Sequence, residues 1–379
     1  MQYFRRLILT LLVIYGFAPK LIPAQTVDEI YQKFNKGYHT YENLTLPYHI
    51  FVPENYDAQQ SYPLILCLHG AGERGDDSLA VRKNSMATVW ARDSIQSRWP
   101  NFILVPQCPQ YWSWTSTDIM LTVNDLLDSL LGVFSVDTNR IYITGLSLGG
   151  NGTWGYIACY PHKYAAAVPV CGWGDTLTAP AIKHVPVWAF HGALDGVVPV
   201  SGTRTMISAL EKEGLTAVYT DCKQGDCTGL PDSTIAAEIN NGATLLYTEY
   251  ETGGHSVWDQ AYNDPLLLPW VFAQSKTNHP AAINEENFAA VPGDFNLVQN
   301  YPNPFNSSTT IKFQIPNSNF VTLEVYNLLG QKVITLVNEH LNTGTHTVIW
   351  NATDLASGVY LECLRVGKYA ATRKLILLR

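Results

Sequence analysis

The sequence lacks the repeats and the composition of fibrous or disordered proteins. Hydrophobic residues make up 46% of its 379 residues, and charged residues make up only 15%. This apolar content excludes intrinsic disorder, and the absence of heptads and of periodic glycine excludes coiled-coil and collagen-like chains. The net charge of −8 argues against binding to nucleic acid, because proteins that bind nucleic acid are usually basic. A globular protein with a large core is therefore expected.

A Cys-x-x-Cys motif is also missing, which argues against a zinc knuckle or a redox-active dithiol. The sequence predicts no metal and no cofactor. Its seven cysteines are an odd number, so at least one of them stays outside any intramolecular disulfide. Cys222 and Cys227 lie five residues apart in a turn-rich stretch and form the best candidate pair.

Only one long apolar run is present, and it lies at the N-terminus. Arg5 and Arg6 precede the apolar residues 7–18, and a Pro-Ala pair follows at 23–24. This order of basic, apolar and small residues is typical of a secretory signal peptide, here residues 1–24. No other run approaches the length of a membrane span. We therefore expect a mature chain without a transmembrane span, secreted or held at the cell surface.

Charge and residue pattern change along the chain, which predicts two domains. A chain of 379 residues is long for one average domain. Residues 25–289 carry a net charge of −13, whereas residues 290–379 carry +2. A stretch without helical or strand periodicity predicts a linker over 276–294. The expected domains are thus residues 25–275 and residues 295–379.

The larger domain alternates between two kinds of pattern. Six runs are apolar throughout, as in strands that helices cover on both faces, and stretches with helical spacing lie between them. Such alternation predicts a mostly parallel, doubly wound α/β sheet, with its active site at the carboxyl ends of the strands. The apolar runs are 63–68, 102–105, 140–144, 165–170, 185–190 and 244–250, and the helical stretches include 118–134 and 201–213.

The smaller domain instead contains short runs in which apolar and polar residues alternate. Alternation indicates strands with one buried and one solvated face, and turn residues separate the runs. The spacing predicts a small, antiparallel, all-β, immunoglobulin-like sandwich. The runs span 309–315, 321–326, 331–336, 345–350 and 358–364.

A candidate catalytic serine lies where one apolar run ends. Ser147 is the central residue of a Gly-x-Ser-x-Gly sequence at 145–149, which is followed by a helix-like stretch over 151–160. Between a strand and a helix, this sequence is typical of a nucleophile elbow, whose glycines permit a tight turn that exposes the hydroxyl. A serine hydroxyl needs a general base to act as a nucleophile at neutral pH.

The order of residues along the chain predicts the acid and the base. On this type of sheet the acid follows the serine, and the histidine comes last. Asp195 lies 48 residues after Ser147 in the loop after the fifth apolar run, and His255 lies 60 residues further on, after the sixth. Asp175 is the rival acid, but it comes one strand too early. In this interpretation His255 is the general base, and Asp195 orients its imidazole.

Two other histidines also end apolar runs. His191 precedes Asp195, which is the wrong order for the base, and His69 belongs to another loop. We expect both rings to form hydrogen bonds within the turns at the strand ends.

Backbone donors must stabilise the oxyanion of a tetrahedral intermediate. The predicted donors are the N–H of Leu148, which follows the nucleophile, and the N–H of Ala71, in the loop after the first apolar run. Glu73 and Arg74 of that loop either pair with each other, meet a polar substrate or form a solvated turn. The candidate substrate-binding residues are Gly70, Gly72, Glu73, Arg74, Trp173 and Trp258, and Trp112 and Trp114 are further loop aromatics that either stack on a substrate or pack.

Residues 40–275 resemble secreted α/β-hydrolase esterases of the group that contains feruloyl and acetylxylan esterases and polyhydroxybutyrate depolymerases. The segments 62–75, 145–154, 188–199 and 254–262 carry the resemblance. It implies the α/β-hydrolase fold, the triad described above and hydrolysis of carboxylic esters. By analogy with the group, plant cell-wall esters such as feruloyl or acetyl xylan are the expected substrate.

The chain departs from the group in one place. Residues 219–243 form a polar stretch that contains both cysteines of the candidate pair and a short helical piece at 233–239. Because this stretch precedes the strand that leads to His255, it either borders the cleft or forms a neutral surface loop.

Residues 299–379 resemble the C-terminal sorting domain of the bacterial type IX secretion system. The resemblance is carried by Gln-Asn-Tyr-Pro-Asn-Pro-Phe-Asn at 299–306, by 325–330 and 356–360, and by the closing residues 374–379. It implies that residues 295–379 engage the type IX machinery, with export through the periplasm and outer membrane of a Gram-negative bacterium. A carbohydrate-binding sandwich is the alternative interpretation of this domain.

Other functions remain open from the sequence. A serine peptidase or a polyhydroxyalkanoate depolymerase could use the same fold and triad. The sequence has no propeller domain of the kind that screens peptides in prolyl oligopeptidases, which argues against the peptidase. A non-catalytic surface-binding protein is the alternative of another class, and the intact triad order argues against it.

Overall fold

The computed structural model describes residues 25–220, 232–278, 296–327, 332–366 and 369–378. The chain divides into two compact units, Met1–Ala281 and Ala282–Arg379. The predicted signal peptide, most of the predicted linker and the candidate disulfide lie outside the described residues.

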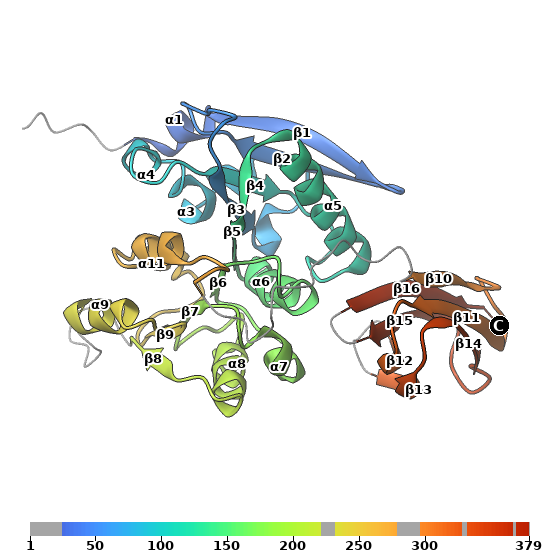
Figure 1. The fold of residues 1–379 in the computed structure, drawn as a ribbon. Helices are drawn as coiled ribbons and strands as arrows, with labels where there is room; N and C mark the ends of the chain where they lie inside the picture. Colours follow the sequence, from blue (N-terminus) through green and yellow to red (C-terminus); the bar gives the residue numbers. More distant parts are fainter. Residues whose placement is uncertain (1–24, 221–231, 279–295, 328–331, 367–368, 379) are drawn as a thin grey trace, which may run out of the picture. The chain divides into compact units, whose positions relative to one another are not determined.

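A nine-stranded sheet forms the centre of the first unit (Figure 1). Neighbouring strands follow the order β1-β2-β4-β3-β5-β6-β7-β9-β8, and every pair from β4 to β8 is parallel. Only β1 and β2 run antiparallel to their neighbours. The predicted mostly parallel α/β sheet is confirmed. The strands are β1 (Phe34–Tyr41), β2 (Leu44–Phe51), β3 (Tyr62–Leu68), β4 (Phe102–Pro106), β5 (Val136–Leu146), β6 (Ala166–Val170), β7 (Val187–Gly192), β8 (Ala217–Tyr219) and β9 (Leu245–Tyr250).

Helices cover both faces of this sheet, which explains why the strands are apolar at every position. In β3, Leu64, Leu66 and Leu68 belong to one core, whereas Ile65 and Cys67 belong to the other. Helices α5 to α8 contribute to the first core, and the remaining helices pack into the second. The helices are α1 (Val27–Tyr31), α2 (Leu79–Arg82), α3 (Ser85–Thr88), α4 (Asp93–Gln96), α5 (Thr117–Val133), α6 (Leu148–Cys159), α7 (Ala179–Ile182), α8 (Ser201–Lys212), α9 (Asp232–Asn240), α10 (Trp258–Tyr262) and α11 (Leu267–Ala273), with single 3-10 turns η1 (Ala71–Glu73) and η2 (Thr176–Thr178). Within the described ranges, no helix combines the length and the hydropathy needed to cross a bilayer.

The structure differs from the sequence prediction at the start of one helix, which lies at the candidate site, and in one hairpin. Helix α6 begins at Leu148, directly after Ser147, and not at Asn151. Its glycines hide the start of the helix, because glycine is the poorest helix former after proline. The β1–β2 hairpin was not predicted, since β1 is an edge strand of mixed burial without a continuous apolar run.

The second unit consists of two antiparallel sheets around one apolar core. Strands β10, β11 and β14 form one sheet, and β13, β12, β15 and β16 form the other. Phe305, Phe313, Trp350 and Leu364 are among the buried side chains between them. This confirms the antiparallel all-β prediction. The strands are β10 (Asn296–Tyr301), β11 (Ser308–Ile315), β12 (Asn319–Asn327), β13 (Lys332–Leu341), β14 (Gly344–Asn351), β15 (Gly358–Val366) and β16 (Tyr369–Leu377).

One carboxyl group interrupts the core of the second unit. Glu362 lies on the inward face of β15 between Tyr360 and Leu364 and is fully buried. Neither of its carboxyl oxygens meets a hydrogen-bond donor among the described residues. Burial raises the pKa of this carboxyl to about 8, despite the opposing charge of Arg373 on β16.

This carboxyl predicts a pH dependence of stability. Between pH 4.5 and about 8, native Glu362 keeps a proton that the unfolded chain has lost, so the stability of the second unit falls as pH rises through this window. Glu362→Leu should remove the dependence and raise the free energy of unfolding at pH 8 by on the order of 4 kcal/mol. Hydrogen exchange of the β15 and β16 amides in the full chain measures this, with the exposed Glu339→Leu as control. An unchanged pH dependence in Glu362→Leu would contradict it.

Candidate active site

Ser147 occupies the tight turn between β5 and α6. Its backbone has φ 55° and ψ −114°, a conformation that residues other than glycine rarely adopt and that is common at functional sites. The turn packs so closely on β3 that position 149 must be glycine, because a methyl group added there would lie 1.7 Å from the carbonyl oxygen of Leu68. Ser147 holds the N-cap position of α6, yet its side chain makes no capping bond to the helix. The hydroxyl is directed to a histidine instead.

The structure brings Ser147, His255 and Asp195 together from three separate loops. His255 Nε2 lies 2.9 Å from Ser147 Oγ, and His255 Nδ1 lies 2.7 Å from Asp195 Oδ2. A carboxylate at Nδ1 favours the tautomer with the proton on that nitrogen, which leaves Nε2 free to accept the proton of the serine. Both contacts lie within hydrogen-bond distance, as a general base and the group that orients it require.

The loops that carry Asp195 and His255 are joined through their backbones. The N–H of Leu194 donates to the carbonyl of Gly253 over 2.9 Å, and the N–H of Ala193 donates to Tyr250 over the same distance. A methyl group at Gly192 would lie 2.2 Å from the carbonyl oxygen of Gly254, so only glycine permits this approach. The distance between the acid and the base is therefore set by the ends of β7 and β9.

The side chain of Asp195 is buried and remains ionised because donors surround it. Its Oδ1 accepts from the N–H groups of Val197 and Val198 over 2.9 and 2.8 Å. Burial acts to raise the pKa of the Asp195 carboxyl, but the hydrogen bonds from His255 and from the two backbone N–H groups outweigh it and hold that pKa below its ordinary value. The rival Asp175 lies elsewhere, where its carboxylate accepts from the N–H of Leu177 at the start of η2.

The two predicted oxyanion donors both begin a helical turn. Leu148 is the first residue of α6 and Ala71 the first residue of η1, so neither N–H has an acceptor within its own helix. The loop after β3 packs on the elbow, since a methyl group at Gly70 would lie 2.8 Å from Leu146 Cδ1. Two N–H groups at helix starts suit a developing negative charge.

Hydrogen bonds of the His69 ring stabilise the loop that carries Ala71. The N–H of Cys108 donates to His69 Nε2 over 2.9 Å, so the ring proton lies on Nδ1 and is donated to the carbonyl of Gly70 over 2.6 Å. Burial lowers the pKa of His69 to about 4, which keeps the ring neutral. Trp114 donates to the carbonyl of His69 over 2.8 Å and is fully buried, so of its two predicted roles it has the packing role.

The predicted substrate-binding residues fall into two groups. Trp258 packs its ring edge-on against His255, with ring centroids 5.4 Å apart, and Trp173 is 39% exposed at the end of β6. Glu73 is buried and pairs with Lys83 over 2.8 Å, not with Arg74. The remaining predicted residues, Gly70, Gly72 and Arg74, lie in the same loop, with Gly72 exposed and Gly70 buried.

The sequence interpretation missed several groups around Asp195. They include the two valine N–H groups and the buried thiol of Cys171, which follows β6 at φ 48°. Cys171, His191 and Asp195 offer ligand atoms within 4.8 Å of one another, but burial raises the pKa of the Cys171 thiol to about 12, and a protonated thiol is a poor metal ligand. The position of His191, four residues before Asp195, was the one available signal in the sequence.

Comparison with known proteins gives a separate result for each unit. Residues 299–378 match the secretion system C-terminal sorting domain. An uncharacterized secreted protein of Arthroderma benhamiae is 30% identical over 203 residues, which cover 44% of this chain and 21% of that protein. A bifunctional acetylxylan esterase/xylanase of Neocallimastix patriciarum is 25% identical over 150 residues, or 40% of this chain and 21% of that protein. The matched part thus spans about a fifth of the length of each curated relative.

Among solved structures, a thermostable esterase superposes with a TM-score of 0.56 at 34% identity, covering 65% of this chain and 64% of that chain. Because the second unit accounts for only 98 residues, a match of this length must include more than half of the first unit. The chain therefore combines an α/β-hydrolase fold, similar to that of esterases, with a secretion system C-terminal sorting domain.

Proposed function

We propose that this chain is an exported serine hydrolase that cleaves carboxylic esters through an acyl-enzyme on Ser147. The observation that carries the proposal is the continuous pair of contacts from Asp195 through His255 to Ser147, at 2.7 and 2.9 Å. The likeness to a thermostable esterase supports ester chemistry on this fold.

In the proposed reaction His255 Nε2 takes the hydroxyl proton as Ser147 Oγ attacks the carbonyl carbon of the ester. The N–H groups of Leu148 and Ala71 stabilise the oxyanion that forms. His255 then donates its proton to the leaving alcohol, which departs as the C–O bond breaks. Water attacks the acyl carbon with His255 again as the base. The bond between the acyl carbon and Ser147 Oγ then breaks, His255 returns the proton to Oγ, and the carboxylic acid is released. Asp195 keeps the imidazole oriented and stabilises its charged form.

We propose esters of plant cell-wall carbohydrates, with acetyl or feruloyl groups, as the substrate. The acetylxylan esterase activity in the name of the Neocallimastix relative supports this class. A pocket of about 390 Å³ also borders the loop that carries Ala71, and its lining includes Tyr38, Gly75, Asp76 and Gln110. Tyr38 is 58% exposed, and its hydroxyl lies 3.3 Å from the Asp76 carboxylate. An exposed aromatic ring beside polar planar groups suits a sugar ring.

Turnover of acetylated xylan, methyl ferulate, p-nitrophenyl acetate and a peptide anilide by the purified full chain tests this proposal. We expect turnover of the xylan or ferulate ester and its loss in Ser147→Ala. Activity on the activated acetate alone would contradict the carbohydrate substrate, and activity on the anilide alone would favour a peptidase. Activity that survives in Ser147→Ala would contradict the mechanism, and inactivity on every substrate would favour a binding protein.

A second variant separates the substrate from the chemistry. Tyr38→Ala should raise KM for acetylated xylan several-fold and leave the kinetics on p-nitrophenyl acetate unchanged, because the small ester carries no sugar for the pocket to bind. Equal effects on both substrates would contradict a role of this pocket in binding the carbohydrate.

We also propose the path by which the chain leaves the cell. Residues 1–24 act as the signal peptide, and residues 295–379 engage the type IX machinery for passage through the outer membrane of a Gram-negative bacterium. The sorting domain found over residues 299–378 supports this proposal. The catalytic domain then spans residues 25–275, with a linker over 276–294.

A further inference from the structure

A second histidine, His191, contacts the carboxylate of the proposed triad. His191 is the second-to-last residue of β7 and is fully buried. Its Nε2 lies 3.1 Å from Asp195 Oδ2 and 3.0 Å from the carbonyl oxygen of Val198. Its Nδ1 lies 2.8 Å from the hydroxyl of Thr203 on α8. The ring therefore connects the acid with the first turn of the next helix.

The neighbours of the His191 ring decide where its proton lies. Nε2 faces a carboxylate oxygen and a carbonyl oxygen, neither of which can donate, so Nε2 carries a proton. Burial lowers the pKa of His191, which favours the neutral ring. The hydroxyl of Thr203 lies within hydrogen-bond distance of both Nδ1 and the carbonyl oxygen of Gly172, which is 3.0 Å away, and it has one proton to donate to either. The Nε2–H group is thus shared between the carbonyl oxygen of Val198 and Asp195 Oδ2, so His191 faces Asp195 as a donor and not as a base.

Four N–H groups consequently face the two oxygens of Asp195. The N–H groups of Val197 and Val198 occupy Oδ1, and His255 and His191 share Oδ2. Rotation of the carboxylate would break bonds at both oxygens in a site that water does not reach. His191 thus contacts the same carboxylate oxygen that orients His255 and helps to fix its position.

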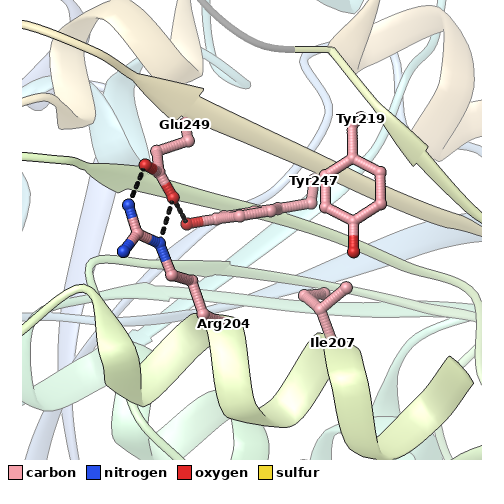
Figure 2. A pocket seen from close by; sticks show the side chains of 5 residues that line it. All are labelled: Arg204, Ile207, Tyr219, Tyr247 and Glu249. Carbon is pink, nitrogen blue, oxygen red and sulfur yellow. Dashed lines mark hydrogen bonds and ion pairs between the residues drawn. The ribbon is translucent and has the colours of Figure 1, made fainter. Parts of the chain in front are cut away.

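Helix α8, which carries Thr203, is itself fixed to the sheet. Figure 2 shows Arg204 of α8 in a bidentate ion pair with Glu249 of β9, and Tyr247 donates to the same carboxylate over 2.6 Å. These residues line a pocket of about 310 Å³ at the edge of the sheet. Glu249 stands opposite His191 in the register of β7 and β9. The ion pair therefore links α8 to β9 beside Thr203, and the Thr203 hydroxyl itself lies 3.0 Å from the carbonyl oxygen of Gly172.

We infer that His191 is a positioning residue of the proposed esterase, which acts by holding Asp195 Oδ2 in line with His255. The inference rests on the proposed function, because it assigns a role within that triad. A histidine that merely fills the core would affect stability alone. A positioning residue must also affect the turnover of folded enzyme, and only while the Asp195 carboxylate is present.

The first test compares two replacements of His191. His191→Leu should lower kcat on p-nitrophenyl acetate by about ten- to hundredfold with little change in KM, the usual loss for a side chain that orients a functional group. His191→Gln should recover most of that loss, because its amide can place an N–H near the position of Nε2. Rates are normalised to the fraction of protein that reacts with a phosphonate, so misfolded protein does not count. Equal kcat in wild type and His191→Leu would overturn the inference.

The second test repeats His191→Leu in the Asp195→Ala background. If His191 acts through Asp195, its replacement should change kcat less than twofold there. The same loss in both backgrounds would overturn the inference and assign His191 a general structural role. Ser147→Ala separates a failure of the proposed function from a failure of this inference. If Ser147→Ala remains active, the proposed function fails. If Ser147→Ala is inactive but His191→Leu is unaffected, only this inference fails.

Discussion

Asp195→Asn should lower kcat on an ester by about ten-thousandfold. The backbone N–H groups of Val197 and Val198 both donate to Oδ1, so they force the amide oxygen of an asparagine into that position. The amide NH₂ then faces His255 Nδ1. This nitrogen must accept a hydrogen bond from the amide and therefore cannot carry the ring proton. The single proton of the neutral ring moves to Nε2, so the ring can no longer accept the proton of Ser147.

Asp175→Asn is the matched control for this exchange. Asp175 is the rival acid in the sequence, but its carboxylate caps η2 through the N–H of Leu177. Its replacement should change kcat less than twofold. Steady-state kinetics of the two variants on p-nitrophenyl acetate give the comparison, and a large loss in Asp175→Asn with little loss in Asp195→Asn would reverse the assignment of the acid.

Gly149→Ala should destabilise the first unit by more than about 3 kcal/mol and abolish activity. The added methyl group would lie 1.7 Å from the carbonyl oxygen of Leu68 and 2.9 Å from that of His69. Both are backbone atoms, so neither can move aside without displacing the end of β3. The elbow and the loop that carries Ala71 would have to separate, which removes the oxyanion site along with the packing.

Gly132→Ala provides the control for an added methyl group in the same unit. Gly132 lies in α5, and a methyl group there meets no atom within 4 Å. Because alanine forms helices better than glycine, this variant should be unchanged or stabilised by up to about 1 kcal/mol. Urea denaturation of both variants measures the difference. A Gly149→Ala protein as stable as Gly132→Ala would show that the elbow does not depend on this approach.

The sequence was sufficient to predict the six central strands of the sheet and the three residues that the structure brings together at the candidate site. The continuous apolar runs reflect strands buried on both faces, and Ser147, Asp195 and His255 follow such runs in an order that topology restricts. The β1–β2 hairpin was not predicted because an edge strand is apolar only in part. Boundaries shifted where glycines obscure a helix, as at the start of α6.

Contacts between distant loops could not be predicted in the same way. The order of residues excluded His191 as the base, and its position four residues before Asp195 was the one signal that the ring could contact that carboxylate. The pairing of Glu73 with Lys83, and not with Arg74, depends on how α2 folds back on the loop. The buried carboxyl of Glu362 interrupts a pattern that otherwise alternates as expected. Each of these depends on tertiary packing, which residue periodicity does not encode.

Covalent labelling tests the central claim, that Ser147 is the nucleophile, most directly. Tryptic cleavage after Arg140 and Lys163 releases residues 141–163, in which Ser147 is the only serine. After reaction of the full chain with a fluorophosphonate, mass spectrometry should find one adduct per chain on this peptide, in proportion to the loss of esterase activity. Ser147→Ala should carry none. An adduct on another peptide, or full activity after complete labelling of Ser147, would contradict the account.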